Sequence, residues 1–230
     1  MDLSVRDENL RELMDDADCD PQRLQATLRR FGIVNRMISG WDTVYRTRLR
    51  QILRSLPQPA RVLDLGSGGG DVIDRLAHLS ARDKLHVEWT GADPDPRAYE
   101  AAVARQIPGA TFHCADADAL LAGGEVFDVV ISNHVLHHLS SSELMHFTAA
   151  SRHLASTAVL HSDIARGRLA YGLFAIGITP LAPGTFLRTD GLRSIRRSYR
   201  PQELTHALGA PWSVSSPVPF RLLAEAPGRA

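Results

Sequence analysis

The run from Arg61 to Asp71, Arg-Val-Leu-Asp-Leu-Gly-Ser-Gly-Gly-Gly-Asp, constrains the fold more than any other part of the chain. Val62, Leu63 and Leu65 form a short apolar run of the kind found in strands buried on both faces of a parallel sheet. After the glycines, apolar residues recur at helical spacing as far as Leu79. The run therefore predicts a buried strand, a glycine turn and a helix in direct succession.

The spacing of the glycines distinguishes two classes of ligand. A dinucleotide-binding turn reads Gly-x-Gly-x-x-Gly and places a pyrophosphate at the helix N-terminus. Counted from Gly66 the third glycine would fall at Asp71, and counted from Gly68 it would fall at Ile73, so neither register fits. A carboxylate at position 71 would also repel a pyrophosphate. Residues 64–70 read instead as Asp-x-Gly-x-Gly-x-Gly.

This stretch resembles the first motif of class I S-adenosylmethionine (SAM)-dependent methyltransferases. The resemblance implies that the turn at Gly66, Ser67 and Gly68 passes beneath the methionine part and ribose of SAM. It also implies that Asp64 helps to hold the methionine end. SAM carries no phosphate, so an acidic turn suits its sulfonium and ammonium groups. We therefore expect SAM as cofactor and S-adenosylhomocysteine (SAH) as product; a glycine turn without a ligand is the alternative.

An acid also follows the second expected strand, residues 85–92. Asp93 lies roughly twenty residues past the glycine turn, where a carboxylate can accept both ribose hydroxyls. Pro94 fixes this position because it ends the strand. The alternative is that Asp93 caps the next helix, although Asp95 can serve as that cap instead.

Further cofactor contacts follow from the family resemblance. Asp116, beside Ala117 after a third strand over 110–115, matches the acid that receives the adenine amino group, with Asp118 as the alternative. Asn133 directly follows a fourth, strongly apolar strand over 126–132. Two helices over 21–57 precede the sheet, and in the family such helices cap the SAM pocket. Their candidate contacts with cofactor or substrate are Asn35, Arg36, Trp41 and Tyr45, and Trp41 and Tyr45 can equally be core residues.

The segment 135–140, Val-Leu-His-His-Leu-Ser, resembles the Val-Leu-His-Asp-Trp-Ser segment of O-methyltransferases that act on phenols. The first histidine there is the general base, and His137 matches it. This chain departs from that family at His138 and Leu139, and His-His also occurs in ubiquinone-biosynthesis-type C-methyltransferases. His134 and Asp163 are further candidates for catalysis, and packing at a helix start is the alternative. His134 and His138 have the i, i+4 spacing of a metal pair but no third ligand follows, so we expect no metal site.

The region 164–199 interrupts the βα repeat. We expect an apolar helix over 164–181, with Leu169, Leu173, Ile176 and Pro180 on one side, and an arginine-rich loop over 183–199. The segment 189–199 resembles that of bacterial methyltransferases encoded beside chalcone-synthase-like polyketide synthases. That resemblance implies a resorcinol, pyrone, quinone or similar aromatic acceptor, with the helix as the substrate wall and the loop as its lid. The alternative is a helix packed on the sheet and a solvated basic loop.

Composition excludes several classes of partner. Lys plus Arg equals Asp plus Glu, at 26 each, so bulk charge favours neither nucleic acid nor an anionic membrane. Cys19 and Cys114 lack CxxC-type partners, which indicates a reduced, cytoplasmic protein. Residues 1–20 have no signal-peptide pattern and read as a solvated, partly mobile leader. Residues 169–181 are too short to span a bilayer, so we expect no stable membrane insertion, and no oligomeric state is predicted.

These patterns predict an α/β fold: a Rossmann-like seven-stranded class I methyltransferase sheet with helices on both faces and a terminal antiparallel hairpin over 212–225. Residues 1–57 would form the N-terminal helical cap and 58–230 the methyltransferase domain. The expected function is methyl transfer from SAM to a small aromatic acceptor, and the resemblance implies the hydroxyl of a phenolic polyketide or quinone-type natural product. The alternatives are a C-methyltransferase of quinone biosynthesis, a non-catalytic SAM-binding protein and, more remotely, a dehydrogenase.

Overall fold

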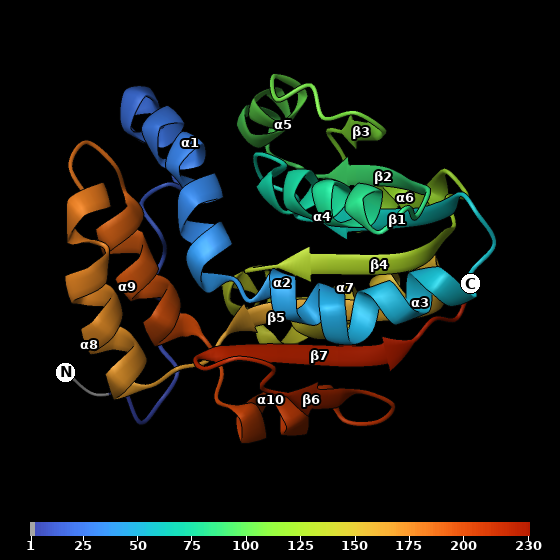
Figure 1. Ribbon diagram of the computed structural model, residues 1–230. Coiled ribbons are helices and arrows are strands. Elements are labelled where there is room, and N and C mark those ends of the chain that lie inside the picture. The colour runs from blue at the N-terminus through green and yellow to red at the C-terminus, as the bar shows by residue number, and fades with distance from the viewer. Residues whose placement is uncertain (1–2) are drawn as a thin grey trace.

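A mixed sheet forms the centre of the structure, a computed structural model that describes residues 3–230. Its strands are β1 (Ala60–Leu65), β2 (Val87–Ala92), β3 (Ala110–His113), β4 (Phe127–Asn133), β5 (Ala155–Ile164), β6 (Ser213–Ser215) and β7 (Arg221–Pro227). The seven strands have the order β3-β2-β1-β4-β5-β7-β6 (Figure 1). Strands β1 to β5 pair in parallel, whereas β7 is antiparallel to both β5 and β6. The predicted Rossmann-like methyltransferase sheet and its terminal hairpin are confirmed.

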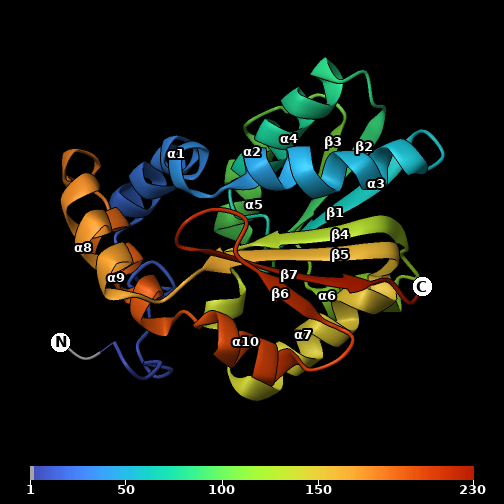
Figure 2. The ribbon, with the colours of Figure 1, turned by 60° about the horizontal axis from the view of Figure 1, so that its bottom comes forward.

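Helices cover both faces of this sheet (Figures 1 and 2). The α-helices are α1 (Pro21–Ile38), α2 (Trp41–Val44), α3 (Arg50–Ser55), α4 (Asp71–Arg82), α5 (Pro96–Val103), α6 (Ala117–Ala122), α7 (Ser141–Leu154), α8 (Arg168–Gly177), α9 (Leu187–Arg197) and α10 (Pro201–Leu208). A π-helical turn, η1 (Tyr45–Leu49), joins α2 to α3, and 3₁₀ turns occur at η2 (Leu136–His138) and η3 (Thr179–Leu181). Helices α2, α3 and α4 lie on one face, and α6, α7 and α10 on the other (Figure 2).

Strand β1 is buried on both sides because successive side chains of a strand point to opposite faces. Val62 packs in the cluster beneath α3 and α4, whereas Leu63 packs in the cluster beneath α6 and α7. Trp41 and Tyr45 belong to the first of these clusters, so both are core residues. The stretch from α2 to α3 is therefore part of the main core.

The N-terminal segment, residues 3–20, differs from the predicted solvated leader. Leu3 and Glu12 are buried, and the Arg6 guanidinium lies 4.1 Å from the centre of the Tyr199 ring. Arg6 also donates from Nη2 to the backbone oxygens of His137 and Leu139, at 3.1 and 2.7 Å. The sequence prediction was wrong here because these partners are more than 100 residues away in the chain and leave no local pattern.

The region 164–199 is also arranged differently from the prediction. Strand β5 continues to Ile164, α8 begins only at Arg168, and the expected arginine-rich loop contains helix α9. Helix α9 packs on α8, where Gly191 leaves room for the Phe174 ring: a Cβ atom at Gly191 would come too close to that ring. Leu169, Leu173 and Ile176 are 64%, 53% and 76% exposed, and the role of this helix as a substrate wall stays a prediction. No helix in the described part of the chain is long and apolar enough to cross a membrane.

Candidate cofactor and acceptor site

The glycine turn after β1 needs glycine for two different reasons. Gly66 and Gly68 both have positive φ, +71° and +52°, which side chains rarely adopt. A Cβ atom at Gly66 would also lie 2.6 Å from Cγ2 of Val135. At Gly68 a Cβ atom would meet no atom within 4 Å. The turn therefore packs tightly at Gly66 and leaves open space at Gly68, where a ligand can approach the backbone.

Asp64 is buried at the end of β1, at 1% exposure, and neither of its carboxylate oxygens has a hydrogen-bond partner among residues 3–230. Burial, with Asp71 and Asp93 nearby, raises the pKa of the Asp64 carboxyl well above its ordinary value. Unpaired buried carboxylates are costly, so they usually meet a cation or a donor in the functional state. The ammonium group of SAM is such a cation. Asp64 thus fits the group that the sequence assigns to it.

Asp93 follows β2 and lies against the same turn. Its Oδ2 accepts a hydrogen bond from the backbone N–H of Gly68 at 2.9 Å, and its Oδ1 accepts one from that of Asp95 at 3.0 Å. Asp95 is the N-cap of α5, where its Oδ1 accepts from the backbone N–H of Arg97 at 2.8 Å. Capping is therefore not the task of Asp93. Burial raises the pKa of the Asp93 carboxyl, and the two backbone donors fix it in place.

Helix α1 reaches the turn through Asn35 rather than Arg36. The Asn35 side chain is buried, and its Nδ2 donates to Oδ2 of Asp71, at the start of α4, at 2.8 Å. Arg36 is exposed in the last turn of α1. Burial raises the pKa of the Asp71 carboxyl. Asn35 therefore connects the N-terminal helix with the glycine turn.

The predicted adenine contact lies at the start of α6. Asp116 is exposed and caps this helix, since its Oδ1 accepts from the backbone N–H of Ala119 at 2.9 Å. Asp118 instead pairs with Nε2 of His146 at 2.8 Å. Ala117 is buried and Pro94 is exposed. The contact of Asp116 with adenine stays a prediction.

Arg221 organises the end of β4. It is buried at the start of β7, and its Nη2 donates to Oδ1 of Asn133 at 2.8 Å and to Oγ of Ser162 at 3.0 Å. Its Nη1 contacts Nε2 of His134, a partly buried residue with a φ of +63°. Burial and Arg221 lower the pKa of His134 well below its ordinary value, and burial lowers the pKa of Arg221 to about 10. Arg221 could not be identified from the sequence, because only the pairing of Ile164 with Arg221 places it at this edge.

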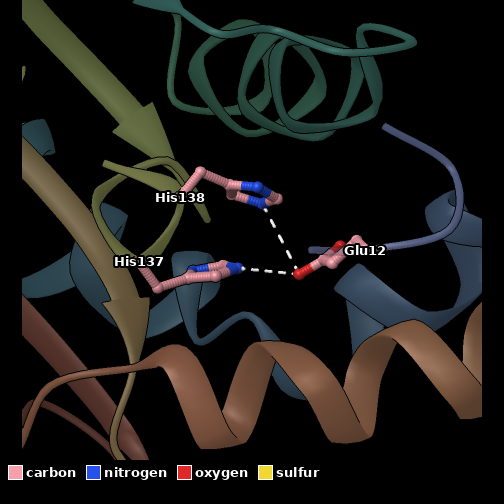
Figure 3. Close-up of side chains that lie close together, drawn as sticks. All are labelled: Glu12, His137 and His138. Atoms are coloured by element: carbon pink, nitrogen blue, oxygen red, sulfur yellow. Dashed lines mark hydrogen bonds and ion pairs between the residues drawn. The ribbon is translucent and has the colours of Figure 1, made fainter. Parts of the chain in front are cut away.

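His137, three residues after His134, is completely buried between two carboxylates. Its Nδ1 lies 2.7 Å from Oδ1 of Asp163, and its backbone N–H donates to Oδ2 of Asp163 at 2.8 Å. Its Nε2 lies 3.3 Å from Oε1 of Glu12 (Figure 3). Burial alone would lower the pKa of His137, but Asp163 and Glu12 raise it to about 9. His137 holds the pKa of Asp163 well below its usual range although burial opposes this.

The chain is similar in sequence to known methyltransferases. Residues 62–157 match the family model described as a methyltransferase domain. The ubiquinone biosynthesis O-methyltransferase of Brucella anthropi is 29% identical over 163 residues, and that of Brucella ovis is 31% identical over 150 residues. Each alignment covers 64% of this chain and 57% of the relative. The chain therefore spans little more than half the length of these relatives.

Solved structures share the fold at low sequence identity. The plantazolicin methyltransferase BpumL, in complex with a pentazolic desmethylPZN analogue and SAH, has a TM-score of 0.56 at 14% identity, covering 91% of this chain and 97% of that one. The DhpI–SAH complex has a TM-score of 0.54 at 17% identity, covering 95% and 98%. Residues 62–157 thus match a methyltransferase domain, the chain has a class I, Rossmann-like methyltransferase fold, and the comparisons support SAM as its cofactor.

Proposed function

We propose that this protein transfers the methyl group of SAM to the hydroxyl of a small aromatic acceptor, such as a phenolic polyketide or a quinone-type natural product. The observation that supports SAM as the methyl donor is the unpaired, buried Asp64 beside a glycine turn with open space at Gly68. The acceptor half is supported by similarity to ubiquinone biosynthesis O-methyltransferases. The polyketide class rests on the resemblance of residues 189–199 to methyltransferases encoded beside polyketide synthases.

Residues at the carboxyl ends of the strands would each hold a different part of SAM. The cofactor supplies a methyl group on a good leaving group. Asp64 would receive the ammonium group, Asp93 the ribose hydroxyls and Asp116 the adenine amino group. Gly68 would allow the backbone to approach the cofactor. Fixing the acceptor oxygen in line with the methyl group can lower the barrier by about 7–11 kcal/mol, so alignment is the largest contribution expected from the protein.

Of the three candidates for catalysis, the geometry favours His134. Nδ1 of His137 faces the carboxylate of Asp163, and its Nε2 faces the carboxylate of Glu12. An acceptor therefore cannot reach His137 or Asp163 unless Glu12 moves. His134 directly follows β4 and is partly exposed. Because Arg221 donates to its Nε2, a neutral His134 carries its proton on Nδ1. That N–H would donate to the acceptor oxygen and stabilise the phenolate that forms when the hydroxyl proton is lost to solvent.

The test is product analysis with methyl-labelled SAM and a panel of resorcinols of graded pKa. O-methylated products are expected, and the turnover of His134→Ala should fall most for the least acidic acceptors. Methylation on carbon would support the alternative of a quinone-type C-methyltransferase and refute the proposed acceptor atom. SAM binding without turnover on any acceptor would indicate a non-catalytic SAM-binding protein. Binding of NADH but not of SAM would refute the cofactor assignment.

A further inference from the structure

A second constellation lies beside the site, where the N-terminal segment meets the loop after β4. A cluster of three possible metal ligands is formed by Glu12, His137 and His138 (Figure 3). Each residue offers one ligand atom, and these atoms all lie within 4.8 Å of one another. Oε1 of Glu12 is 3.3 Å from Nε2 of His137 and 3.6 Å from Nε2 of His138. In the sequence, His134 and His138 have the spacing of a metal pair. The structure instead brings His138 together with His137 and a carboxylate from far away in the chain.

The two separations from Oε1 of Glu12, 3.3 and 3.6 Å, are close to those between ligands around one metal ion. Bonds of about 2.0–2.1 Å from zinc to nitrogen or oxygen, at tetrahedral angles, put ligand atoms about 3.3–3.4 Å apart. Two imidazoles with one carboxylate form a donor set that transition metals prefer, whereas magnesium and calcium prefer oxygen ligands. Three protein ligands leave a fourth position open, as in catalytic zinc sites.

The two histidines are oriented as metal ligands usually are. Nδ1 of His137 is held by Asp163 at 2.7 Å, and Nδ1 of His138 lies 3.3 Å from Oδ2 of Asp15. A carboxylate on the far nitrogen fixes the ring and leaves Nε2 for the metal. The Glu12 carboxylate is also held in place, because the Ser194 hydroxyl donates to its Oε1 at 2.5 Å.

The backbone of the ligand loop is also fixed. Nε of Arg197 donates to the backbone oxygen of His137 at 3.1 Å, and its Nη2 donates to that of His138 at 2.7 Å. Arg6 adds a hydrogen bond from its Nη2 to the backbone oxygen of His137. Preorganised ligands lose little conformational freedom when a metal binds.

We propose that Glu12, His137 and His138 bind one divalent transition-metal ion of the zinc class. The site does not depend on the proposed methyl transfer. It would tie the N-terminal segment to the loop after β4, because Glu12 comes from the former and both histidines from the latter. The side chain of His138 is 30% exposed while those of Glu12 and His137 are buried, so the ion enters from the side of His138.

The experiment uses the full-length protein, freed of metal by a chelator and titrated with Co²⁺, a spectroscopic probe for zinc sites. Calorimetry should give one ion per chain, and the complex should show the visible d–d bands of low-coordinate Co²⁺. His138→Ala should abolish the bands and weaken Co²⁺ binding by more than about 100-fold. Loss of a residue that only hydrogen-bonds to a metal ligand already costs up to about 100-fold, and loss of the ligand itself should cost more. His206→Ala is the control, because His206 is exposed on α10 and lies outside the cluster. It should bind Co²⁺ as the wild type does.

Glu12→Gln provides a second variant that keeps the size of the buried side chain. It should lose most of the affinity while its circular dichroism spectrum stays native. The proposal is overturned if the wild type binds no stoichiometric Co²⁺, since the cluster is then held by hydrogen bonds alone. It is also overturned if His138→Ala and His206→Ala bind Co²⁺ equally well, since surface histidines then account for the binding. Equal binding of Mg²⁺ and Co²⁺ would contradict the zinc-class assignment.

Discussion

Replacing Asp64 by Asn tests the assignment of the cofactor site, because it should lower the affinity for SAM and raise the stability of the protein without SAM. Asn has nearly the same shape as Asp but carries no charge. In the wild type, neither carboxylate oxygen of Asp64 has a partner among the described residues. We therefore expect the variant to bind SAM more weakly and, without SAM, to be more stable than the wild type. A residue that merely supports the fold would not show this pair of effects.

The expected loss of binding follows from the strength of a hydrogen bond to a charged group, about 1.5–3 kcal/mol. At 1.4 kcal/mol per factor of ten, this corresponds to a rise in the dissociation constant of about 10- to 150-fold. Isothermal titration calorimetry with SAM measures it directly. Asp74→Asn is the matched control, because it removes one negative charge from the first turn of α4 at a side chain that is 41% exposed. The control should bind SAM as the wild type does.

The expected gain in stability depends on pH in a defined direction. The pKa of Asp64 is raised above its ordinary value of 3.8, so the folded state holds its proton to higher pH than the unfolded state. The stability of the wild type without SAM therefore falls as pH rises from about 3.8 through the folded-state pKa, by up to about 1.4 kcal/mol per pH unit. Asp64→Asn lacks this loss. Its advantage in thermal unfolding should thus grow as pH rises.

Two results would refute the reasoning. An unchanged dissociation constant for SAM in Asp64→Asn would mean that the ammonium group lies elsewhere. A variant less stable than the wild type at neutral pH would mean that the carboxylate has a stabilising partner in solution.

Three further predictions concern single residues. Gly68→Val should abolish SAM binding in a folded protein, because its side chain would fill the open space at the turn, and calorimetry showing wild-type affinity would contradict this. Asp93→Ala should weaken SAM by about 1.5–3 kcal/mol, and an unchanged affinity would leave Asp93 with only its backbone hydrogen bonds. Burial lowers the pKa of His161 from 6.5 to about 3, so stability should fall as pH drops below 6.5, by up to about 1.4 kcal/mol per unit. His161→Phe should remove that part, and parallel stability curves of the two proteins between pH 7 and pH 5 would disprove it.

The cofactor half of the site could be predicted from the sequence because its signals are local. Asp64 and the glycines lie within one strand–turn–helix unit, and Asp93 is one βα unit further along. In a parallel sheet the carboxyl ends of neighbouring strands share one edge, so finding the strands was enough to bring these acids together. The start of α7 carries a local signal of the same kind, since Oγ of Ser140 accepts from the backbone N–H of Glu143, whose side chain accepts from that of Ser140.

The surroundings of His137 could not be predicted, because its partners are far away in the sequence. Glu12 lies in an acidic segment that reads as solvated, and nothing in its neighbours marks it as buried. Arg197 lies in a basic stretch that reads as a loop. Its burial follows from hydrogen bonds to two backbone oxygens some 60 residues away, at His137 and His138. Charged side chains buried through such contacts carry no periodic pattern.

Contacts from distant parts of the chain hold the loop after β4 in place. Three segments converge on it: Arg6 and Glu12 come from the N-terminal segment, Arg197 from α9, and Asp163 from the end of β5. In the proposed function, His134 at the start of the same loop meets the acceptor. A change in the N-terminal segment or in α9 can therefore move the acceptor-facing loop directly, and it would reach the glycine turn only through the packing of Val135 against Gly66. Acceptor choice would then be set largely by those distant segments, and SAM binding by the βαβ unit itself.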